Sequence, residues 1–367
     1  MNFDFSDDQK LLSDQVQRFL DEQCDMTCVR QVLENPPRFV PAVWQGLSDM
    51  GLLGTAVPET YGGTGAGYAE LCLVAQQIGA HLAPVPFGST VYLLSEALLQ
   101  YGSEAQKEKW LPKICSGSVK GALAAVEALA QLAPEQVHAT VTDGVIRGKK
   151  MVVADGSIAD LYLVLAQSNQ GLGLYLVSSG EGITATAVDS VDLSRDVAEI
   201  EFTDAPAELL SSDGWGALQK LFDRAAVLYA FEQLGGAQRA LQMAVGYAQE
   251  RFAFGRAIGS FQAIKHMLAD MYVSMKLAES NCFYAAWALE NDAPDLALAA
   301  ATARVGATQA FQQCARDNIQ VHGGMGFTWE FDCHLYYRRS NFLALELGGL
   351  SEWEARLVDA LPLQNFA

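Results

Sequence analysis

The chain has 367 residues, of which 50% are hydrophobic and 18% charged, a composition that excludes an extended disordered tail and predicts two or three globular domains. Its 24 basic and 43 acidic residues give a formal charge of −19, which argues against a nucleic-acid partner because phosphate binding needs a basic face. An anionic cofactor can still bind through a few local arginines and helix N-termini.

The start of the chain and its cysteines indicate a cytoplasmic protein. Residues 1–8 have neither a basic region nor an apolar run, so no signal peptide is predicted. Apolar runs such as 296–303 are too short to span a bilayer. The seven cysteines are widely spaced without a C-x-x-C pair, which fits buried thiols in a reducing compartment better than disulfides or a metal site.

The first third of the chain reads as helices. Ser6 followed by two aspartates predicts an N-cap, and apolar residues recur at helical spacing up to Leu20. After three prolines, a second apolar pattern covers 43–53, and helical periodicity returns over 70–78, 89–101 and 104–114. The glycine-rich stretch 58–67 lacks the Lys-Ser/Thr of a P-loop, so we predict an ordinary connecting loop.

From about residue 121 the pattern changes to short β-branched or alternating runs separated by Gly, Asp, Asn and Ser. Seven such runs without intervening helices predict a small antiparallel barrel or sandwich. The runs are 137–141, 145–146, 151–153, 161–165, 173–177, 183–187 and 198–202.

From residue 209 the strands give way to long helices with Ala-rich faces, predicted over 218–250, 261–291, 294–320 and from about 335. The chain is therefore predicted to be an α+β protein with a helical domain at 1–120, a β domain at 121–208 and a helical bundle at 209–367.

Two motifs in the bundle carry chemistry. The first, within 247–270, places Arg251, Phe254 and Gly255 at a corner between two helices. A guanidinium at a helix end suits a diphosphate or a carboxylate, although by themselves these residues are better explained by an Arg–Glu pair and a core Phe. The second, 320–327, puts glycines directly after a long helix. They would let a ligand approach the backbone, although by themselves they are better explained as a plain helix C-cap and loop. His322 within it reads as a structural hydrogen-bonding group rather than a base.

Together, Arg-x-x-Phe-Gly with a following Phe-Gln, and then Gln-x-x-Gly-Gly-x-Gly, make the chain resemble the acyl-CoA dehydrogenase family over nearly its whole length. The stretches 52–54, 57–65, 148–151 and 159–160 also look like the family's N-terminal and β domains. The resemblance implies an N-terminal helical domain, a middle β-barrel and a C-terminal four-helix bundle, assembled as a dimer or a dimer of dimers around FAD.

The activity implied by the resemblance is oxidation of an acyl-CoA thioester to its trans-2-enoyl form in lipid or steroid catabolism. A carboxylate removes the α-proton while the β-hydrogen leaves as hydride to the flavin. Because the α-proton is weakly acidic, the base must be a desolvated carboxylate of raised pKa, and the enolate oxygen must be held by hydrogen bonds.

The family residues that reach the FAD of a neighbouring subunit are all kept. By the resemblance they are Arg251, Phe254, Gln262, Gln320, Gly323 and Gly324. The residues that serve a subunit's own flavin are mostly missing. The loop that faces the flavin ring is replaced by residues 126–131, and a Thr-Asn pair becomes Ala154-Asp155.

The catalytic base is also missing. The family's Glu-Gly-Thr falls on Gly348, Gly349 and Leu350, and an alternative base position on the first bundle helix is Ala225. Glu346 is a substitute candidate, although a displacement of two residues turns a helical side chain by about 200°. Two further acidic groups have structural interpretations, Glu232 as a buried acid bonded to Arg or backbone and Asp223-Arg224 as a helix-end ion pair.

Three hypotheses follow. In the first, the chain is a self-sufficient homo-oligomeric acyl-CoA dehydrogenase that uses Glu346 or another acid. In the second, it completes the FAD site of a homologous catalytic chain in a heteromer. In the third, it is a flavin-free structural member of the family. We favour the heteromer, because the kept and the lost residues divide along the subunit interface.

Overall fold

The computed structural model describes residues 5–34, 38–128 and 131–361. The chain forms two compact units, each assembled from separate stretches. We call Met1–Thr27, Tyr68–Ala83 and Ala226–Ala367 the helical unit, and Cys28–Gly67 with Pro84–Ala225 the mixed unit. The predicted boundaries near residues 120 and 208 stay a prediction. Pro36, Pro37, Leu129 and Ala130 lie outside the described residues.

The helical unit begins with a capped helix, as predicted. Ser6 Oγ accepts a hydrogen bond from the Gln9 amide at 3.2 Å, and the Gln9 side chain accepts from the Ser6 amide at 2.8 Å. Its helices are α1 (Asp7–Gln23), α4 (Tyr68–Ala80), the part of α7 (Gly214–Glu250) from residue 226, α8 (Gln262–Glu290), α9 (Leu296–His322), α10 (Cys333–Leu345) and α11 (Leu350–Ala360). Its shorter elements are β9 (Phe252–Ala253), β10 (Arg256–Ala257), η5 (Ile258–Ser260) and η6 (Gly323–Phe327).

Helices α4 and α7 cross with their backbones in contact. A Cβ atom added to Gly235 would lie 1.8 Å from the Gln76 carbonyl oxygen, and one added to Gly79 would lie 1.8 Å from that of Glu232. Only glycine leaves room for this approach, so the crossing depends on these two residues.

The mixed unit combines helices with a sheet. Its helices are α2 (Met26–Glu34, which begins in the helical unit), α3 (Pro41–Asp49), η1 (Leu52–Gly54), η2 (Glu59–Tyr61), the π-helical η3 (Gly88–Ser95), α5 (Glu96–Tyr101), α6 (Glu104–Cys115), η4 (Pro134–Gln136) and the first turns of α7. The predicted helix over 89–101 is thus a π-helical segment that continues as an α-helix.

The strands form one eight-stranded sheet of order β6-β7-β3-β2-β4-β5-β8, with β1 paired to β4. They are β1 (Gly121–Ala124), β2 (Thr140–Thr142), β3 (Val145–Ala154), β4 (Leu161–Ser168), β5 (Gly171–Ser178), β6 (Ile183–Ala187), β7 (Val197–Pro206) and β8 (Glu208–Ser211). The predicted order of helices, strands and helices is confirmed. The purely antiparallel interpretation is wrong, because β1 and β2 both pair parallel with β4. The runs 145–146 and 151–153 belong to the single strand β3, whose register shifts between them.

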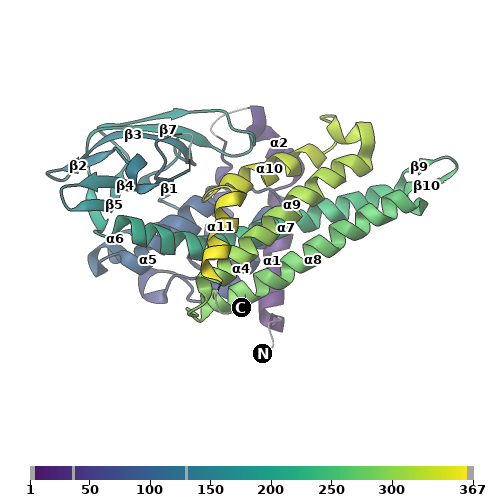
Figure 1. The fold of residues 1–367 in the computed structure, drawn as a ribbon, viewed down its shortest axis with the longest axis horizontal. Helices are drawn as coiled ribbons and strands as arrows, with labels where there is room; N and C mark the ends of the chain where they lie inside the picture. The colour runs from purple at the N-terminus through teal and green to yellow at the C-terminus, as the bar shows by residue number, and fades with distance from the viewer. Residues whose placement is uncertain (1–4, 35–37, 129–130, 362–367) are drawn as a thin grey trace. The chain divides into compact units, whose positions relative to one another are not determined.

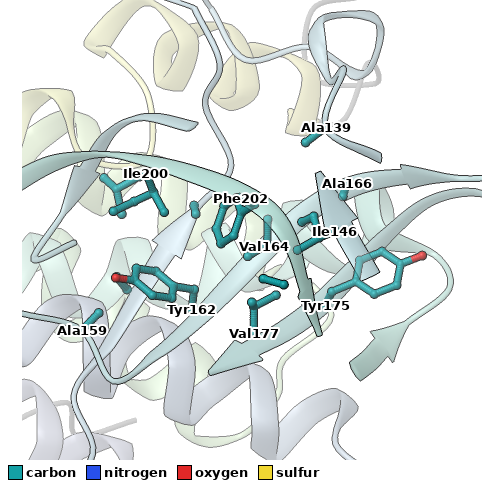
Figure 2. Close-up of a cluster of buried hydrophobic side chains, with 14 of the residues drawn as sticks. Ala139, Ile146, Ala159, Tyr162, Val164, Ala166, Tyr175, Val177, Ile200 and Phe202 are labelled. Atoms are coloured by element: carbon teal, nitrogen blue, oxygen red, sulfur yellow. The ribbon is translucent and has the colours of Figure 1, made fainter. Parts of the chain in front are cut away.

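The sheet closes over an apolar core (Figure 2). Ile146, Val164 and Ile200 are fully buried, and the rings of Tyr162 and Phe202 meet edge to face with centroids 6.0 Å apart. Alternating side chains of β3, β4 and β7 supply this core. In β4 the other face is buried as well, since Leu161, Leu163 and Leu165 are fully buried.

A buried ion pair lies beside this core. Lys150 is fully buried, and its Nζ donates to Glu127 Oε1 at 2.5 Å, to the Leu165 carbonyl at 2.6 Å and to the Ala125 carbonyl at 3.2 Å. Burial lowers the pKa of Lys150. Burial acts to raise the pKa of Glu127, but hydrogen bonds from Lys150 and two backbone amides outweigh it and hold the pKa below its usual value. The pair therefore fixes the segment that leads away from β1.

Replacing Lys150 with methionine is expected to lower the free energy of unfolding by about 3–5 kcal/mol, because the Glu127 carboxylate loses its partner while it stays largely buried. Lys149→Met is the matched control, since Lys149 is half exposed and pairs with Glu199 at the surface, and it should cost less than about 1 kcal/mol. Urea denaturation measures both. Equal effects of the two substitutions would contradict the structural role of Lys150.

Candidate functional site

The two sequence motifs meet at one end of the helical unit. Three contacts at rising positions show that α7 and α9 run parallel. Gly236 faces the Phe311 ring, Asn318 Nδ2 lies 4.0 Å from Met243 Sδ, and the rings of Tyr247 and His322 stack. The C-terminal ends of both helices therefore lie together.

Helix α8 runs antiparallel to α9 and brings its N-terminus to the same end (Figure 1). Cys314 on α9 donates to the Met271 carbonyl on α8 at 3.6 Å. Gln262 lies nine residues before Met271, and Gln320 lies six residues after Cys314, so both extend toward this end. We call the end formed by residues 247–262 and 320–327 the motif end.

Between α7 and α8 the chain forms a tight hairpin. Phe254 and Gly255 both have positive φ, 52° and 79°, as a two-residue turn between β9 and β10 requires. The Ile258 amide donates to the Arg251 carbonyl at 2.8 Å and closes the base of the hairpin. The Phe254 side chain is 96% exposed, while Arg256 lies over the Phe261 ring at 4.0 Å. A strained aromatic residue held in solvent is a costly arrangement that a partner surface would offset.

The polar residues of the motif end point outward. Arg251, Gln262 and Gln320 are all exposed. Within the described part of the chain, none of the three side chains makes a hydrogen bond or ion pair. Gly323 (φ 60°) and Gly324 are exposed too, and a Cβ atom on either would meet nothing within 4 Å. The residues predicted to reach a ligand are thus gathered and accessible, and within the described residues the side chains of Arg251, Gln262 and Gln320 make no hydrogen bond or ion pair.

The local charge at the motif end is positive in an acidic protein. Residues 247–262 and 320–327 contain Arg251 and Arg256 against one acidic residue, Glu250, whereas the whole chain carries −19. Helix α8 also begins here, and its N-cap residue Phe261 offers no side-chain cap. Its first amide groups and the positive end of its dipole are suited to a phosphate oxygen.

His322 lies between the two motifs and is 6% exposed. Its Nδ1 donates to the Asn318 carbonyl at 2.8 Å, and its ring stacks on Tyr247 with centroids 4.0 Å apart. Burial lowers its pKa, so the neutral ring is favoured. These contacts agree with the structural interpretation of His322.

The two positions that the resemblance assigns to the base hold no acid. Ala225 on α7 is a fully buried methyl group. Gly348 has φ 100°, and a Cβ atom there would lie 2.3 Å from Glu352 Oε2. Burial raises the pKa of Glu352, whose carboxylate fills the space that a side chain at position 348 would enter. Glu352 was not predicted as a site residue, because its approach to position 348 depends on the positive φ of Gly348.

Glu346 is half-buried at the end of α10. Its carboxylate accepts a hydrogen bond from the Tyr229 hydroxyl at 3.2 Å, and its main-chain carbonyl accepts from Arg304 Nη2 at 2.6 Å. Arg304 is buried and also bonds the Leu343 carbonyl and Gln233. Burial lowers the pKa of Arg304 to about 10. Arg304 was not predicted as a site residue. The feature of the sequence that could have indicated it is an isolated charge within the Ala-rich first half of α9.

Two other acidic groups have structural roles. Glu232 is fully buried, as predicted, and its Oε1 lies 3.9 Å from Arg339 Nη1, which is an ion-pair contact rather than a hydrogen bond. The prediction that Asp223 and Arg224 form a helix-end ion pair is wrong, because α7 already begins at Gly214. Arg224 instead pairs with the buried Glu96 of the mixed unit.

In the mixed unit, Ala154-Asp155 stand where the resemblance places a Thr-Asn pair, and the Asp155 carboxylate is bound by side chains of the same unit. Asp155 is 2% exposed, and its Oδ2 accepts from Arg195 Nη2 at 2.8 Å and from the Ser89 hydroxyl. Burial raises its pKa, with Arg195 acting in the opposite direction. Of the replaced loop, Glu127 is bound to Lys150. These side chains are committed to the protein's own packing.

The described residues contain no cluster of three or more acidic, cysteine or histidine side chains placed to hold a metal ion. Within the same residues, every helix is too short or too polar to cross a membrane.

Comparison with family models identifies two domains. Residues 6–118 match the N-terminal domain of acyl-CoA dehydrogenases and residues 212–360 match their C-terminal domain. Among curated proteins, acyl-CoA dehydrogenase FadE27 of Mycobacterium tuberculosis is 30% identical over 363 residues, which is 95% of each chain.

Solved structures with the same fold include heteromeric assemblies. The ChsE4-ChsE5 complex from Mycobacterium tuberculosis contains a chain that is 29% identical, with a TM-score of 0.90 over 98% of each chain. A variant of the Tcur3481-Tcur3483 steroid acyl-CoA dehydrogenase contains a chain that is 29% identical with a TM-score of 0.88, covering 96% of this chain and 97% of that chain.

Proposed function

The chain belongs to the acyl-CoA dehydrogenase family, and we propose that it completes the FAD site of a homologous catalytic chain. The reaction of that assembly is α,β-dehydrogenation of an acyl-CoA thioester. The observation that carries the proposal is the motif end, where Arg251, Gln262 and Gln320 are exposed and have no partner within the described part of their own chain.

The residues of the motif end fit a diphosphate. Arg251 offers a planar fork of donors to phosphate oxygens, and the uncapped N-terminus of α8 adds amide donors. Gln262 and Gln320 each supply an amide for further hydrogen bonds, and the open glycines let a ligand approach the backbone. When bound, FAD supplies the acceptor for the substrate's β-hydrogen.

The mixed unit does not fit a flavin of its own. A flavin ring needs donors that are free to bind it, but Asp155 is buried and bound to Arg195 and Ser89. The chain also has Gly348 and Ala225 where the family places its base. We therefore assign removal of the α-proton and the holding of the flavin to the partner chain, and to this chain the motif residues that complete the partner's FAD site.

A second candidate function is a self-sufficient enzyme with Glu346 as its base. The observation in its favour is the half-buried carboxylate, which the Tyr229 hydroxyl holds at 3.2 Å. A base of raised pKa needs such partial desolvation.

Replacing Glu346 with glutamine separates the two functions. The amide keeps an acceptor for Tyr229 but cannot remove a proton. In the assembled enzyme we expect the turnover of straight-chain acyl-CoA thioesters in a dye-reduction assay to change less than about twofold, whereas removal of a general base costs roughly 100- to 10,000-fold. A loss in that range would make Glu346 the base and this chain catalytic.

The substrate and the compartment are also proposals. Relatives include a protein described as a steroid acyl-CoA dehydrogenase, which supports a lipid or steroid acyl-CoA thioester. All seven cysteines keep their thiols and six of them are buried, which supports a reducing cytoplasm.

The proposal is tested by purifying the chain alone and measuring flavin absorbance per chain. We expect little FAD and little acyl-CoA oxidation, and both should be restored by co-expression with a homologous catalytic chain. A complex of the two chains that contains no flavin would instead favour the third hypothesis, in which the chain is a flavin-free structural member of the family.

A further inference from the structure

We propose that Tyr247 and His322 form a positioning pair that sets Arg251 relative to Gln320, Gly323 and Gly324. The inference rests on the proposed function, since it explains how two motifs about 70 residues apart in the sequence present one ligand surface. Neither residue is assigned a contact with the cofactor.

The pair joins the last turns of two parallel helices. Tyr247 precedes Arg251 by one helical turn, and the Arg251 amide donates to the Tyr247 carbonyl at 2.8 Å. His322 is the last residue of α9 and directly precedes Gly323. Their rings are nearly parallel, 24° apart, with centroids at 4.0 Å. A displacement of either ring therefore moves one half of the motif end against the other.

Neighbouring contacts hold the histidine ring in its plane. Nδ1 donates to the Asn318 carbonyl one turn earlier on α9. Phe331 meets both rings edge-on, at 6.0 Å from Tyr247 and 5.6 Å from His322. One turn below, Asn318 contacts Met243. The stack is thus the outermost of the three contacts between α7 and α9 described above, and the exposed Arg251, Gly323 and Gly324 follow it along the chain.

If the stack positions the two motifs, the side chain at position 322 must be a flat ring that can stack on Tyr247. His322→Leu keeps an apolar volume but removes the plane that stacks on Tyr247, and we expect it to weaken FAD binding by the assembled protein about tenfold. His322→Phe keeps the plane and loses only the bond to Asn318, so it should stay within about threefold of the unaltered protein. Tyr247→Leu should match His322→Leu.

The experiment measures FAD affinity by reconstitution of the flavin-depleted oligomer and, separately, the melting temperature without flavin. His266→Leu is the control, because His266 is an exposed histidine on α8. The proposal predicts loss of affinity in the two leucine variants, rescue by phenylalanine, and melting temperatures that do not follow this order.

Two results would overturn the inference. Unchanged affinity in His322→Leu would show that the stack positions nothing. Affinity that simply tracks melting temperature across all variants would reduce the pair to a packing contact. Failure of the proposed function is distinguishable, because the unaltered oligomer would then bind no FAD.

Discussion

Replacing Arg251 with alanine is expected to weaken FAD binding by the assembled protein roughly 10- to 150-fold, the cost of losing a hydrogen bond to a charged group. The guanidinium is exposed and makes no hydrogen bond or ion pair within the described chain, so the substitution removes a ligand group without breaking an internal contact. The stability of the chain alone should change by less than about 0.5 kcal/mol. Flavin titration and thermal unfolding measure the two quantities.

Two variants control this prediction. Arg316→Ala removes another exposed arginine of the helical unit, one that pairs with Asp317, and should leave FAD affinity unchanged. Arg251→Lys keeps the charge but loses the planar fork, so it should recover only part of the affinity. If alanine at position 251 binds FAD as well as arginine does, the motif end is not a cofactor surface.

Replacing Gly235 with alanine is expected to destabilise the helical unit by about 1–3 kcal/mol or more, because the new Cβ atom would lie 1.8 Å from the Gln76 carbonyl oxygen. Backbone cannot rotate away as a side chain does, so α4 and α7 must separate. Urea unfolding followed by far-ultraviolet circular dichroism reports the loss.

Gly246→Ala is the matched control on the same helix. A Cβ atom there meets nothing within 4 Å, and alanine should stabilise the helix by about 0.5–1 kcal/mol. Opposite signs at the two glycines would show that the crossing, rather than helix propensity, decides the outcome. A stabilising effect at position 235 would contradict the observed approach of α4 and α7.

Local sequence patterns predicted the features that depend only on neighbouring residues. These features include the N-cap at Ser6 and the glycine corner at Gly255, which need only nearby backbone groups. The run Gly121–Ala124 escaped prediction because Gly and Ala have weak strand propensity, and its pairing with β4 is set by residues forty positions away.

The site divides in the same way. Its six motif residues were predicted from the resemblance to the family, but their common location depends on the parallel alignment of α7 with α9, which Gly236, Met243 and Tyr247 establish through tertiary contacts. The ion-pair partners of Asp155 and Lys150 could not be predicted from the sequence either, because these buried pairs join residues that are distant in the chain.

If this chain lends residues to a flavin held by another chain, the flavin content depends on that second chain. The direct measurement is flavin per chain in the chain purified alone and in its complex with a co-expressed homologue. We expect almost none in the first and one flavin for each pair of unlike chains in the second. A yellow homo-oligomer with one flavin per chain that oxidises acyl-CoA thioesters would contradict this expectation.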